Sequence, residues 1–294
     1  MGVLDGFLGL FSGGGKAVNV AKRFDLQGKT GQGSMSKVYK AYDRTLGRTI
    51  CLKLLDKEKT KKFEERFKGL KTKKPTEGQI CTKLNHPNLV TTYEHGVTTD
   101  GEPYLVMEWV EGKGLSYYVD SKSKYLDGKR IHFIAQLCDA IAYLHAQKFL
   151  HRDLCPRNIM VATDDVVKLI DFGLTIPYAP EYCGPGNRTG SPEYLAPEIN
   201  QRIAPDHRVD LFALGIAPYE MFTFDMPWER SVSSEETFRR RMNAPPRSAK
   251  VLNPKLDDAV VKVLNKSVAK ERNERYGSAE DMKAAFLGLE KQDY

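Results

Sequence analysis

The sequence is poor in cysteine, and its cysteines show no pairing pattern. There are five of them, scattered through 294 residues, and no two form a C-x-x-C pair. They are Cys51, Cys81, Cys138, Cys155 and Cys183. An odd number at irregular spacing argues against a disulfide framework and against a zinc site, and it fits a reducing compartment, so a cytoplasmic location is expected.

Long apolar runs, internal repeats and targeting signals are also missing. Every candidate apolar run is broken by Lys, Asp or Gly before it reaches membrane-spanning length. The N-terminus, MGVLDGFLGLFSGGGK, lacks the basic start of a secretory signal, and Gly6 stands where an acylation motif needs Ser or Thr. We therefore expect no integral membrane segment and no export.

The positive charge of the chain is concentrated in one run. The net charge is +7, and residues 57–74, KEKTKKFEERFKGLKTKK, hold nine basic and three acidic residues. The rest of the chain is therefore near neutral, which argues against nucleic acid as a partner. The run predicts a solvated helix or loop, and a docking patch for an acidic partner is the alternative.

Strand and helix signals are segregated along the chain. Residues 24–55 and 89–110 read as short apolar strands bounded by turn residues, with Asp100-Gly101 marking a hairpin turn. After residue 111, apolar residues recur at helical spacing within 129–148, and a capping-box start at Ser278 predicts a last helix over 279–289. Strands followed by helices predict the α+β class.

Two stretches in the strand-rich part have the chemistry of a phosphate site. Residues 31–38, GQGSMSKV, form a Gly-rich loop whose backbone can approach phosphate oxygens, although a Gly-rich turn alone is common. Lys53 stands inside the apolar strand TICLKLL. A lysine in such a setting needs anionic partners, and a phosphate with a carboxylate would serve.

Two stretches in the helix-rich part supply carboxylates. In HRDLCPRN, residues 151–158, Asp153 can accept a proton from a hydroxyl nucleophile and Asn158 offers an amide oxygen to a hard cation. Asp171 follows the strand VVKLI and leads Asp171-Phe172-Gly173, a good position for a Mg²⁺ ligand. Further on stand Ala196-Pro197-Glu198 and Asp210.

Taken in order, these motifs resemble the eukaryotic-type (Hanks-type) protein kinases, and in particular the bacterial serine/threonine members of that family. The Gly-rich loop, strand Lys, HRD loop, DFG and APE appear in that family's order over roughly residues 24–290. The resemblance implies a bilobal fold with a small antiparallel β-rich N-lobe and a larger helical C-lobe. We expect a tail at 1–23 and a kinase domain at 24–290, with lobes at 24–110 and 111–290.

The resemblance also implies roles for individual residues. Lys53 grips the α- and β-phosphates of ATP, Asp153 is the catalytic base, and Asn158 and Asp171 hold Mg²⁺. The expected nucleotide-binding residues are Thr30, Gly31, Gly33, Ser34, Val38, Cys51, Lys53, Glu108, Val110 and Met160. Glu198 is expected to pair with Arg275, and Asp210 to bind the backbone of the HRD loop.

The carboxylate partner of Lys53 is predicted from its distance to a later motif. In many members of the family that the chain resembles, this Glu lies nine residues before the His of an HPN turn. The HPN turn here is His86-Pro87-Asn88, so the resemblance implies Glu77, 24 positions after Lys53. Pro75 stops a helix from extending far before Glu77. We therefore expect a shortened helix after a separate basic segment around 63–70. The alternative is that Glu77 is simply a first-turn residue favoured by the helix dipole.

The HRD loop departs from the family pattern at Cys155. Serine/threonine kinases usually place a Lys there, whose charge neutralises the transferring phosphoryl group, and Cys155 cannot do so. Arg157, four residues after Asp153, stands where some receptor tyrosine kinases carry an Arg. We hypothesise that Arg157 replaces the missing charge, the alternative being a solvent-facing Arg. Ser36 replaces the usual third glycine of the Gly-rich loop, with a modest expected effect.

The predicted activity is ATP-dependent transfer of the γ-phosphoryl group to Ser or Thr hydroxyls of a protein substrate. Residues 190–194, GSPEY, resemble the segment that serine/threonine kinases place beside the acceptor. Autophosphorylation is expected, with Thr189 as the favoured site. A pseudokinase scaffold and a small-molecule phosphotransferase remain as alternatives, and no oligomeric state is predicted.

Overall fold

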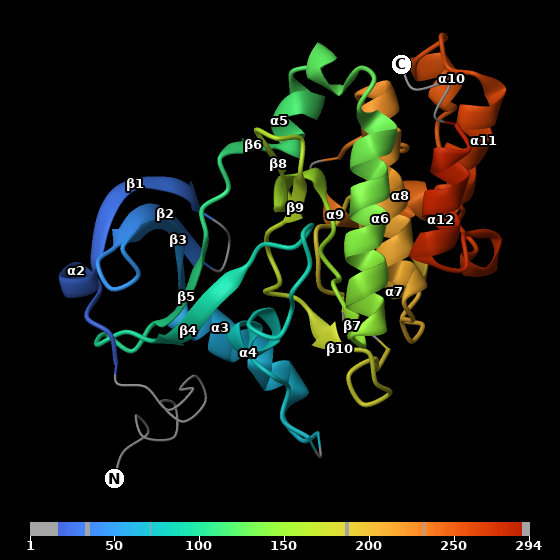
Figure 1. Cartoon of the computed structure of the whole chain (residues 1–294). Coiled ribbons are helices and arrows are strands. Elements are labelled where there is room, and N and C mark those ends of the chain that lie inside the picture. The colour runs from blue at the N-terminus through green and yellow to red at the C-terminus, as the bar shows by residue number, and fades with distance from the viewer. Residues whose placement is uncertain (1–16, 33–35, 71, 186–187, 232, 290–294) are drawn as a thin grey trace. The chain divides into compact units, whose positions relative to one another are not determined.

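The chain divides into two compact units. The computed structural model describes residues 17–32, 36–70, 72–185, 188–231 and 233–289. The N-terminal unit contains the described residues up to His86 and Val90–Glu111, and the C-terminal unit contains Pro87–Leu89 and the described residues from Gly112 onward. Strands dominate the first unit and helices the second (Figure 1), which confirms the predicted bilobal α+β fold.

The N-terminal unit is built on an antiparallel sheet in the order β1-β2-β3-β5-β4. Gly101, with φ +77°, sits in the β4–β5 turn, as the Asp-Gly pair predicts. The elements of this unit are α2 (Val20–Arg23), β1 (Phe24–Gln32), β2 (Ser36–Asp43), β3 (Arg48–Leu55), α3 (Lys57–Glu64), the 3₁₀ helix η1 (Glu65–Phe67), α4 (Glu77–Cys81), β4 (Thr92–Val97) and β5 (Pro103–Glu108).

Alternation along the strands gives this sheet two different faces. Ile50 and Leu52 on β3 and Val106 on β5 are fully buried in the core cluster of the unit. Because side chains alternate across a strand, Cys51 and Lys53 lie on the opposite face of β3. The apolar run TICLKLL therefore anchors one face in the core and presents a lysine on the other.

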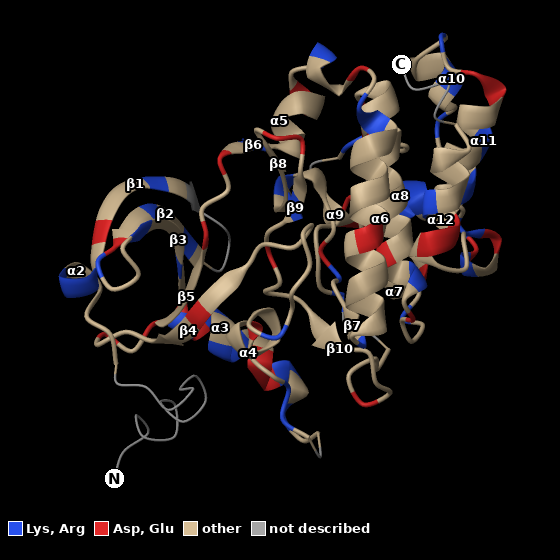
Figure 2. Cartoon of the chain, in the orientation of Figure 1, with Lys and Arg blue, Asp and Glu red and all other residues tan. Residues whose placement is uncertain are grey.

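The basic run is helical and only partly solvated. It forms α3 and η1, earlier in the chain than the expected segment at 63–70 (Figure 2). Phe63 and Phe67 are buried, and Lys74 is 7% exposed, with Nζ 5.2 Å and 5.8 Å from the centroids of those two rings. Cation–π contacts thus hold Lys74 against two aromatic rings of the same run.

Helix α4 is short, as Pro75 predicts. It has five residues, and Thr76 caps it in a capping box with Gln79. Glu77 is its first residue. This start places the Glu77 carboxylate at the helix N-terminus, where the helix dipole favours a negative charge.

The C-terminal unit is built around α6 and α8. Every residue of α8 except Arg208 is buried, while α6 buries Ile134, Leu137, Ile141 and others at helical spacing. The elements are β6 (Gly112–Gly114), α5 (Leu115–Asp120), η2 (Lys124–Leu126), α6 (Arg130–Ala146), β7 (Phe149–Leu150), η3 (Pro156–Asn158), β8 (Ile159–Ala162), β9 (Val167–Leu169), β10 (Ile176–Pro177), α7 (Pro197–Asn200), α8 (Arg208–Thr223), α9 (Ser234–Asn243), α10 (Ala249–Leu252), α11 (Asp258–Ser267), η4 (Arg272–Glu274) and α12 (Ala279–Leu287).

Helix α12 closes the unit beside α6 (Figure 1). Ser278 caps it by accepting a hydrogen bond from the Asp281 amide, as predicted. Lys283 on α12 binds both carboxylate oxygens of Asp139 on α6 at 2.7 and 2.8 Å. Within the described ranges, no helix is both long and apolar enough to cross a bilayer.

Candidate active site

The N-terminal unit pairs Lys53 with Glu77. Lys53 Nζ lies 2.6 Å from Glu77 Oε1, and the two side chains are 5% and 8% exposed. The predicted ion pair is therefore present, across 24 residues of sequence. Burial strengthens this ion pair, and the Glu77 carboxylate holds the Lys53 ammonium in one place.

Val38 and Cys51 share the sheet face of Lys53. Val38 lies directly opposite Lys53 in the β2–β3 ladder, and Cys51 precedes Lys53 by two residues. Burial raises the pKa of the Cys51 thiol to about 11, against a smaller opposing effect of the Lys53 charge. The thiol is therefore neutral at physiological pH and serves as an apolar wall.

The Gly-rich loop is described only at its start and end. Gly31 on β1 pairs with Val38 on β2, and Thr30 Oγ1 donates to the Val38 carbonyl at 3.5 Å. Gly33 and Ser34 lie outside the described residues. The two predicted residues on β1 therefore lie next to the strand position that faces Lys53.

Glu108, the last residue of β5, and Val110, two residues on, are the residues predicted to bind adenine. The Glu108 amide donates to the Thr91 carbonyl at 2.9 Å, and the Glu108 side chain accepts from the Thr91 amide at 2.7 Å. The backbone donor of Glu108 is thus engaged within the unit. A nucleotide hydrogen bond at this residue would have to use its carbonyl, with Val110 supplying a donor two residues on.

The C-terminal unit surrounds the Asp153 carboxylate with hydrogen-bond donors. Asn158 Nδ2 donates to Asp153 Oδ2 at 3.1 Å and to its carbonyl at 2.8 Å. Ser191 donates to Asp153 Oδ1 twice, from its amide and from its hydroxyl, each at 2.8 Å. Asp153 is therefore held in place and already accepts a hydrogen bond from an alcohol, which is the geometry that a general base requires.

Asp210 on α8 fixes the backbone of the HRD loop, as predicted. Its oxygens accept from the amides of His151 and Arg152, both at 2.8 Å, and His145 Nε2 lies 2.9 Å away. Complete burial acts to raise the pKa of Asp210, but these hydrogen bonds and the nearby imidazoles lower it overall. Asp210 is therefore a buried anion whose charge is matched by loop donors.

Asn158 and Asp171 lie at the same end of the β8–β9 hairpin. Ile159 pairs with Leu169, and the Ile170 amide donates to the Asn158 carbonyl at 3.0 Å. Because Asn158 Nδ2 faces Asp153, the amide oxygen points the other way. A carboxylate and an amide oxygen fit Mg²⁺, which keeps several waters and takes few protein ligands. Met160 lies half-buried on β8, two residues after Asn158.

The comparisons with known proteins agree with this geometry. A family model described as "Protein kinase domain" matches residues 24–287. The chain belongs to the protein kinase domain family.

Several relatives of this kinase domain are bacterial kinases. It is 31% identical over 268 residues to the serine/threonine-protein kinase PrkC of Bacillus subtilis, covering 90% of this chain and 40% of the relative. It is 32% identical over 284 residues to PknB of Mycolicibacterium smegmatis, covering 92% and 43%, and 28% identical over 289 residues to pkn3 of Myxococcus xanthus, covering 93% and 51%. The chain thus spans about half the length, or less, of these relatives.

Arg157 of the HRD loop contacts Ser191, which in turn contacts Asp153. Its Nη2 donates to Ser191 Oγ at 3.2 Å, and that hydroxyl in turn donates to Asp153. Burial lowers the pKa of Arg157, but neighbouring acidic groups, Asp153 among them, raise it overall. The guanidinium is therefore charged, and the Ser191 hydroxyl bridges it to Asp153, as the hypothesis of a compensating charge requires.

Cys155 is a packing residue. Its side chain is 1% exposed, and burial, followed by the charge of Asp153, raises its pKa to about 11. It carries no negative charge at physiological pH. The substitution therefore removes the usual lysine without adding a competing base.

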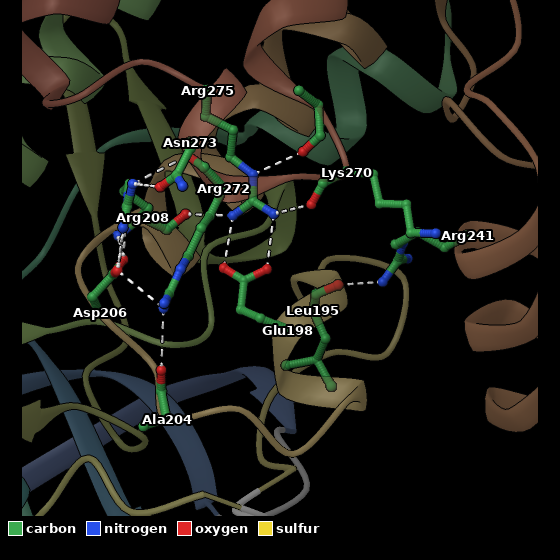
Figure 3. A network of polar contacts seen from close by, with 11 residues as sticks. Leu195, Glu198, Ala204, Asp206, Arg208, Arg241, Lys270, Arg272, Asn273 and Arg275 are labelled. Atoms are coloured by element: carbon green, nitrogen blue, oxygen red, sulfur yellow. Dashed lines mark hydrogen bonds and ion pairs between the residues drawn. The ribbon is translucent and has the colours of Figure 1, made fainter.

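Away from the catalytic loop, Glu198 and Arg275 form the expected buried pair. Arg275 Nη1 and Nη2 donate to the two carboxylate oxygens of Glu198 at 2.7 and 2.8 Å (Figure 3). The two side chains are 5% or less exposed. This bidentate geometry fixes α7 against the chain before α12.

Sequence reasoning missed three residues near the GSPEY segment. Ser191 was recognised only as part of the segment, without its bonds to Asp153. Glu220 on α8 accepts from the Tyr194 hydroxyl at 2.8 Å, and burial raises the pKa of Glu220 to about 7. Arg241 on α9 donates to the carbonyls of Pro192 and Glu193 in the segment and of Leu195 directly after it. Glu220 lies within an apolar stretch of the sequence, and an acidic residue in such a stretch is the signal that could have identified it as buried.

Proposed function

We propose that the chain is an ATP-dependent protein kinase that transfers the γ-phosphoryl group to Ser or Thr hydroxyls of a protein. The observation that carries the proposal is the hydrogen bond from the Ser191 hydroxyl to Asp153 Oδ1. It demonstrates that an aliphatic alcohol reaches this carboxylate at 2.8 Å. A Ser or Thr of a substrate has the same chemical group.

Roles toward the nucleotide are assigned to residues of each unit separately. Lys53, held by Glu77, contacts the α- and β-phosphates, as the strand lysine of this family does. The Gly-rich loop, with Thr30, Gly31, Gly33 and Ser34, covers the phosphates. Val38, Cys51 and Met160 contact the purine, and the backbones of Glu108 and Val110 bind its edge. The kinase domain is assigned to residues 24–290, preceded by the tail 1–23.

Asn158 and Asp171 would hold the magnesium. The ion supplies positive charge that neutralises the phosphate oxygens during transfer. The amide oxygen of Asn158 and the carboxylate of Asp171 are hard donors of the kind that Mg²⁺ prefers.

In the reaction, Asp153 accepts the proton of the attacking hydroxyl. The hydroxyl oxygen forms a bond to the γ-phosphorus while the bond from that phosphorus to the β-γ bridging oxygen breaks and ADP leaves. Asn158 holds the carboxylate in place by two hydrogen bonds. Arg157, through its contact with Ser191, supplies positive charge near the transferring group, the role that Cys155 cannot fill.

The protein-acceptor class rests on the GSPEY segment. Ser191 ties this segment to Asp153, which supports its use as the surface beside the acceptor residue. Autophosphorylation at Thr189 remains a prediction. The Thr189 side chain is 8% exposed, so phosphorylation requires a rearrangement of this part of the chain.

Neither alternative function gains support. The pseudokinase reading rests on Cys155 and Ser36, whereas Lys53, Asp153, Asn158 and Asp171 are all present. The small-molecule phosphotransferase reading is disfavoured by the APE glutamate Glu198 with its Arg275 partner, and by Asp210. A cytoplasmic location stays inferred from the five cysteines, all of them free thiols.

The test is phosphoryl transfer from radiolabelled ATP with a generic protein acceptor. We expect transfer by the wild type and a loss of about 100-fold or more in Asp153→Asn, because the base is removed. Asp258→Asn, at a side chain that is 89% exposed on α11, is the matched control. Binding of ATP without any transfer would favour the pseudokinase, and transfer only to a metabolite would favour the third class.

A further inference from the structure

Arg241 is a buried cation whose hydrogen bonds go to the backbone. It lies on α9 and is 1% exposed. Nη2 donates to the Glu193 carbonyl at 2.5 Å, both terminal nitrogens donate to the Pro192 carbonyl at 3.2 Å, and Nη1 donates to the Leu195 carbonyl (Figure 3). Among the residues that the structure describes, all its hydrogen bonds are of this kind.

Burying this guanidinium is costly. Loss of water lowers the pKa of Arg241 to about 10, so the group still carries its charge at neutral pH. The rings of Phe212 and Trp228 lie 5.6 and 5.5 Å from the guanidinium carbon and recover part of the lost solvation. A packed apolar side chain would avoid the cost. The carbonyls of one short segment therefore account for the presence of an arginine here.

Those carbonyls belong to the segment that reaches Asp153. We name residues 190–196 the acceptor segment. Ser191, immediately before the first carbonyl that Arg241 binds, donates its amide and its hydroxyl to Asp153. Gly190 has φ +130°, and a Cβ there would lie 2.5 Å from the Arg152 carbonyl. The segment is thus packed on the HRD loop at its start and hydrogen-bonded to α9 along the rest.

We propose that Arg241 is a positioning residue that sets the acceptor segment for the protein substrate. This proposal rests on the proposed kinase function. Three carbonyls at different directions need a planar group with several donors, which Arg provides and Lys does not. Without it the segment relaxes, the Ser191 contact to Asp153 loosens, and the substrate hydroxyl is misplaced. Misplacement by a fraction of an ångström lowers the rate strongly.

The test separates acceptor use from nucleotide binding. Arg241→Met removes the donors at similar length, Arg241→Lys keeps the charge, and Arg239→Met is the matched control at a 72% exposed side chain of α9. We expect kcat/KM for a peptide acceptor to fall about 10-fold or more in Arg241→Met and by less in Arg241→Lys. Affinity for an ATP analogue stays within about 2-fold of wild type in all three variants.

Rates are taken per active molecule, counted by titration with the ATP analogue. An unchanged kcat/KM per active molecule, with only a lower melting temperature, would overturn the proposal, because a purely structural role predicts that result. An equal loss of nucleotide affinity would overturn it as well.

A second measurement keeps the inference testable if Arg241→Met fails to fold. Hydrogen exchange of the Ser191 amide reports its bond to Asp153 directly. We expect exchange about 10-fold or more faster in Arg241→Lys than in wild type. Unchanged exchange would contradict the proposal. If the wild type transfers no phosphate, the kinase function fails, and the exchange result still decides whether Arg241 positions the segment.

Discussion

Replacing Arg275 by Met is expected to be among the most destabilising single changes in the C-terminal unit. The Arg275 side chain is fully buried and makes five hydrogen bonds, two of them to the Glu198 carboxylate. Its guanidinium also lies 4.7 Å from the centroid of the Phe212 ring. The other three acceptors are the carbonyls of Ala269, Lys270 and Arg208.

The magnitude follows from what the substitution leaves behind. Removing one partner of a buried ion pair costs about 3–5 kcal/mol, because the remaining charge is buried without a counter-charge. Three carbonyls lose a donor at the same time, and each such loss costs about 1 kcal/mol. We therefore expect the free energy of unfolding to fall by about 6–8 kcal/mol. Neutralising the orphaned carboxylate with Glu198→Gln should recover about 2 kcal/mol of that loss.

Urea unfolding at pH 7 measures this effect. Trp228 stacks on Phe212 at a centroid distance of 6.0 Å and is therefore a fluorescence probe within the C-terminal unit. A Trp109→Phe background removes the tryptophan of the N-terminal unit. A loss below about 1 kcal/mol in Arg275→Met, or no recovery in the double variant, would refute the reasoning about an uncompensated buried charge.

Two further predictions concern charges beside the acceptor segment. Arg157→Ala should lower kcat for phosphoryl transfer by more than about 10-fold, with Arg157→Lys retaining more activity; a smaller loss in steady-state kinetics contradicts the compensating charge. Glu220 is 1% exposed, and burial raises its pKa to about 7 despite the nearby Tyr194 hydroxyl and Arg230. Between its unfolded-state pKa near 4.5 and about 7, the folded protein binds more protons, so the free energy of unfolding falls as pH rises. Glu220→Gln removes this loss. Urea unfolding from pH 4.5 to 8 should therefore show that the free energy of unfolding of the variant exceeds that of wild type by a margin that grows with pH to about 3 kcal/mol. A pH-independent difference contradicts the assignment.

The sequence predicts features that depend on local order along the chain. The Gly-rich loop, Lys53, the HRD loop and Asp171 appear in order, so their roles follow from position. Pro75 limits α4 to five residues, which the φ restriction of proline predicts. The Lys53–Glu77 pair spans 24 residues, yet counting from a later motif identifies it.

The missed features depend on which way a helix faces. Arg239, Arg240 and Arg241 are consecutive like charges, but only Arg241 of the three is buried. Thr237, four residues earlier, is the other buried residue of α9, so both lie on one face of the helix. The position of each arginine around the helix axis decides which one is buried. Three consecutive like charges give no apolar pattern from which that position could be predicted.

The basic run illustrates the same limit. Its charge predicts solvation, and most of its lysines are exposed. Phe63, Phe67 and Lys74 are buried together instead, because two aromatic rings recur at helical spacing within the charges and offer their faces to an ammonium. Net charge describes the surface of such a segment, while its few apolar residues determine how it packs.

Arg241 and Arg275, two of the buried arginines of the C-terminal unit, share one physical logic. A buried charge pair stabilises a protein poorly, since well-packed apolar residues of similar volume are often as stable. Arg275, however, binds two backbone carbonyls of irregular chain and Arg241 binds three, and an apolar side chain would leave those carbonyls without these donors. Loop backbone lacks the repeating partners of a helix or sheet, so it takes up a single conformation only where other groups satisfy it. The two guanidinium groups therefore fix the conformation of loops, at the cost of their own desolvation. In the acceptor segment, the loop conformation decides where a substrate hydroxyl meets Asp153.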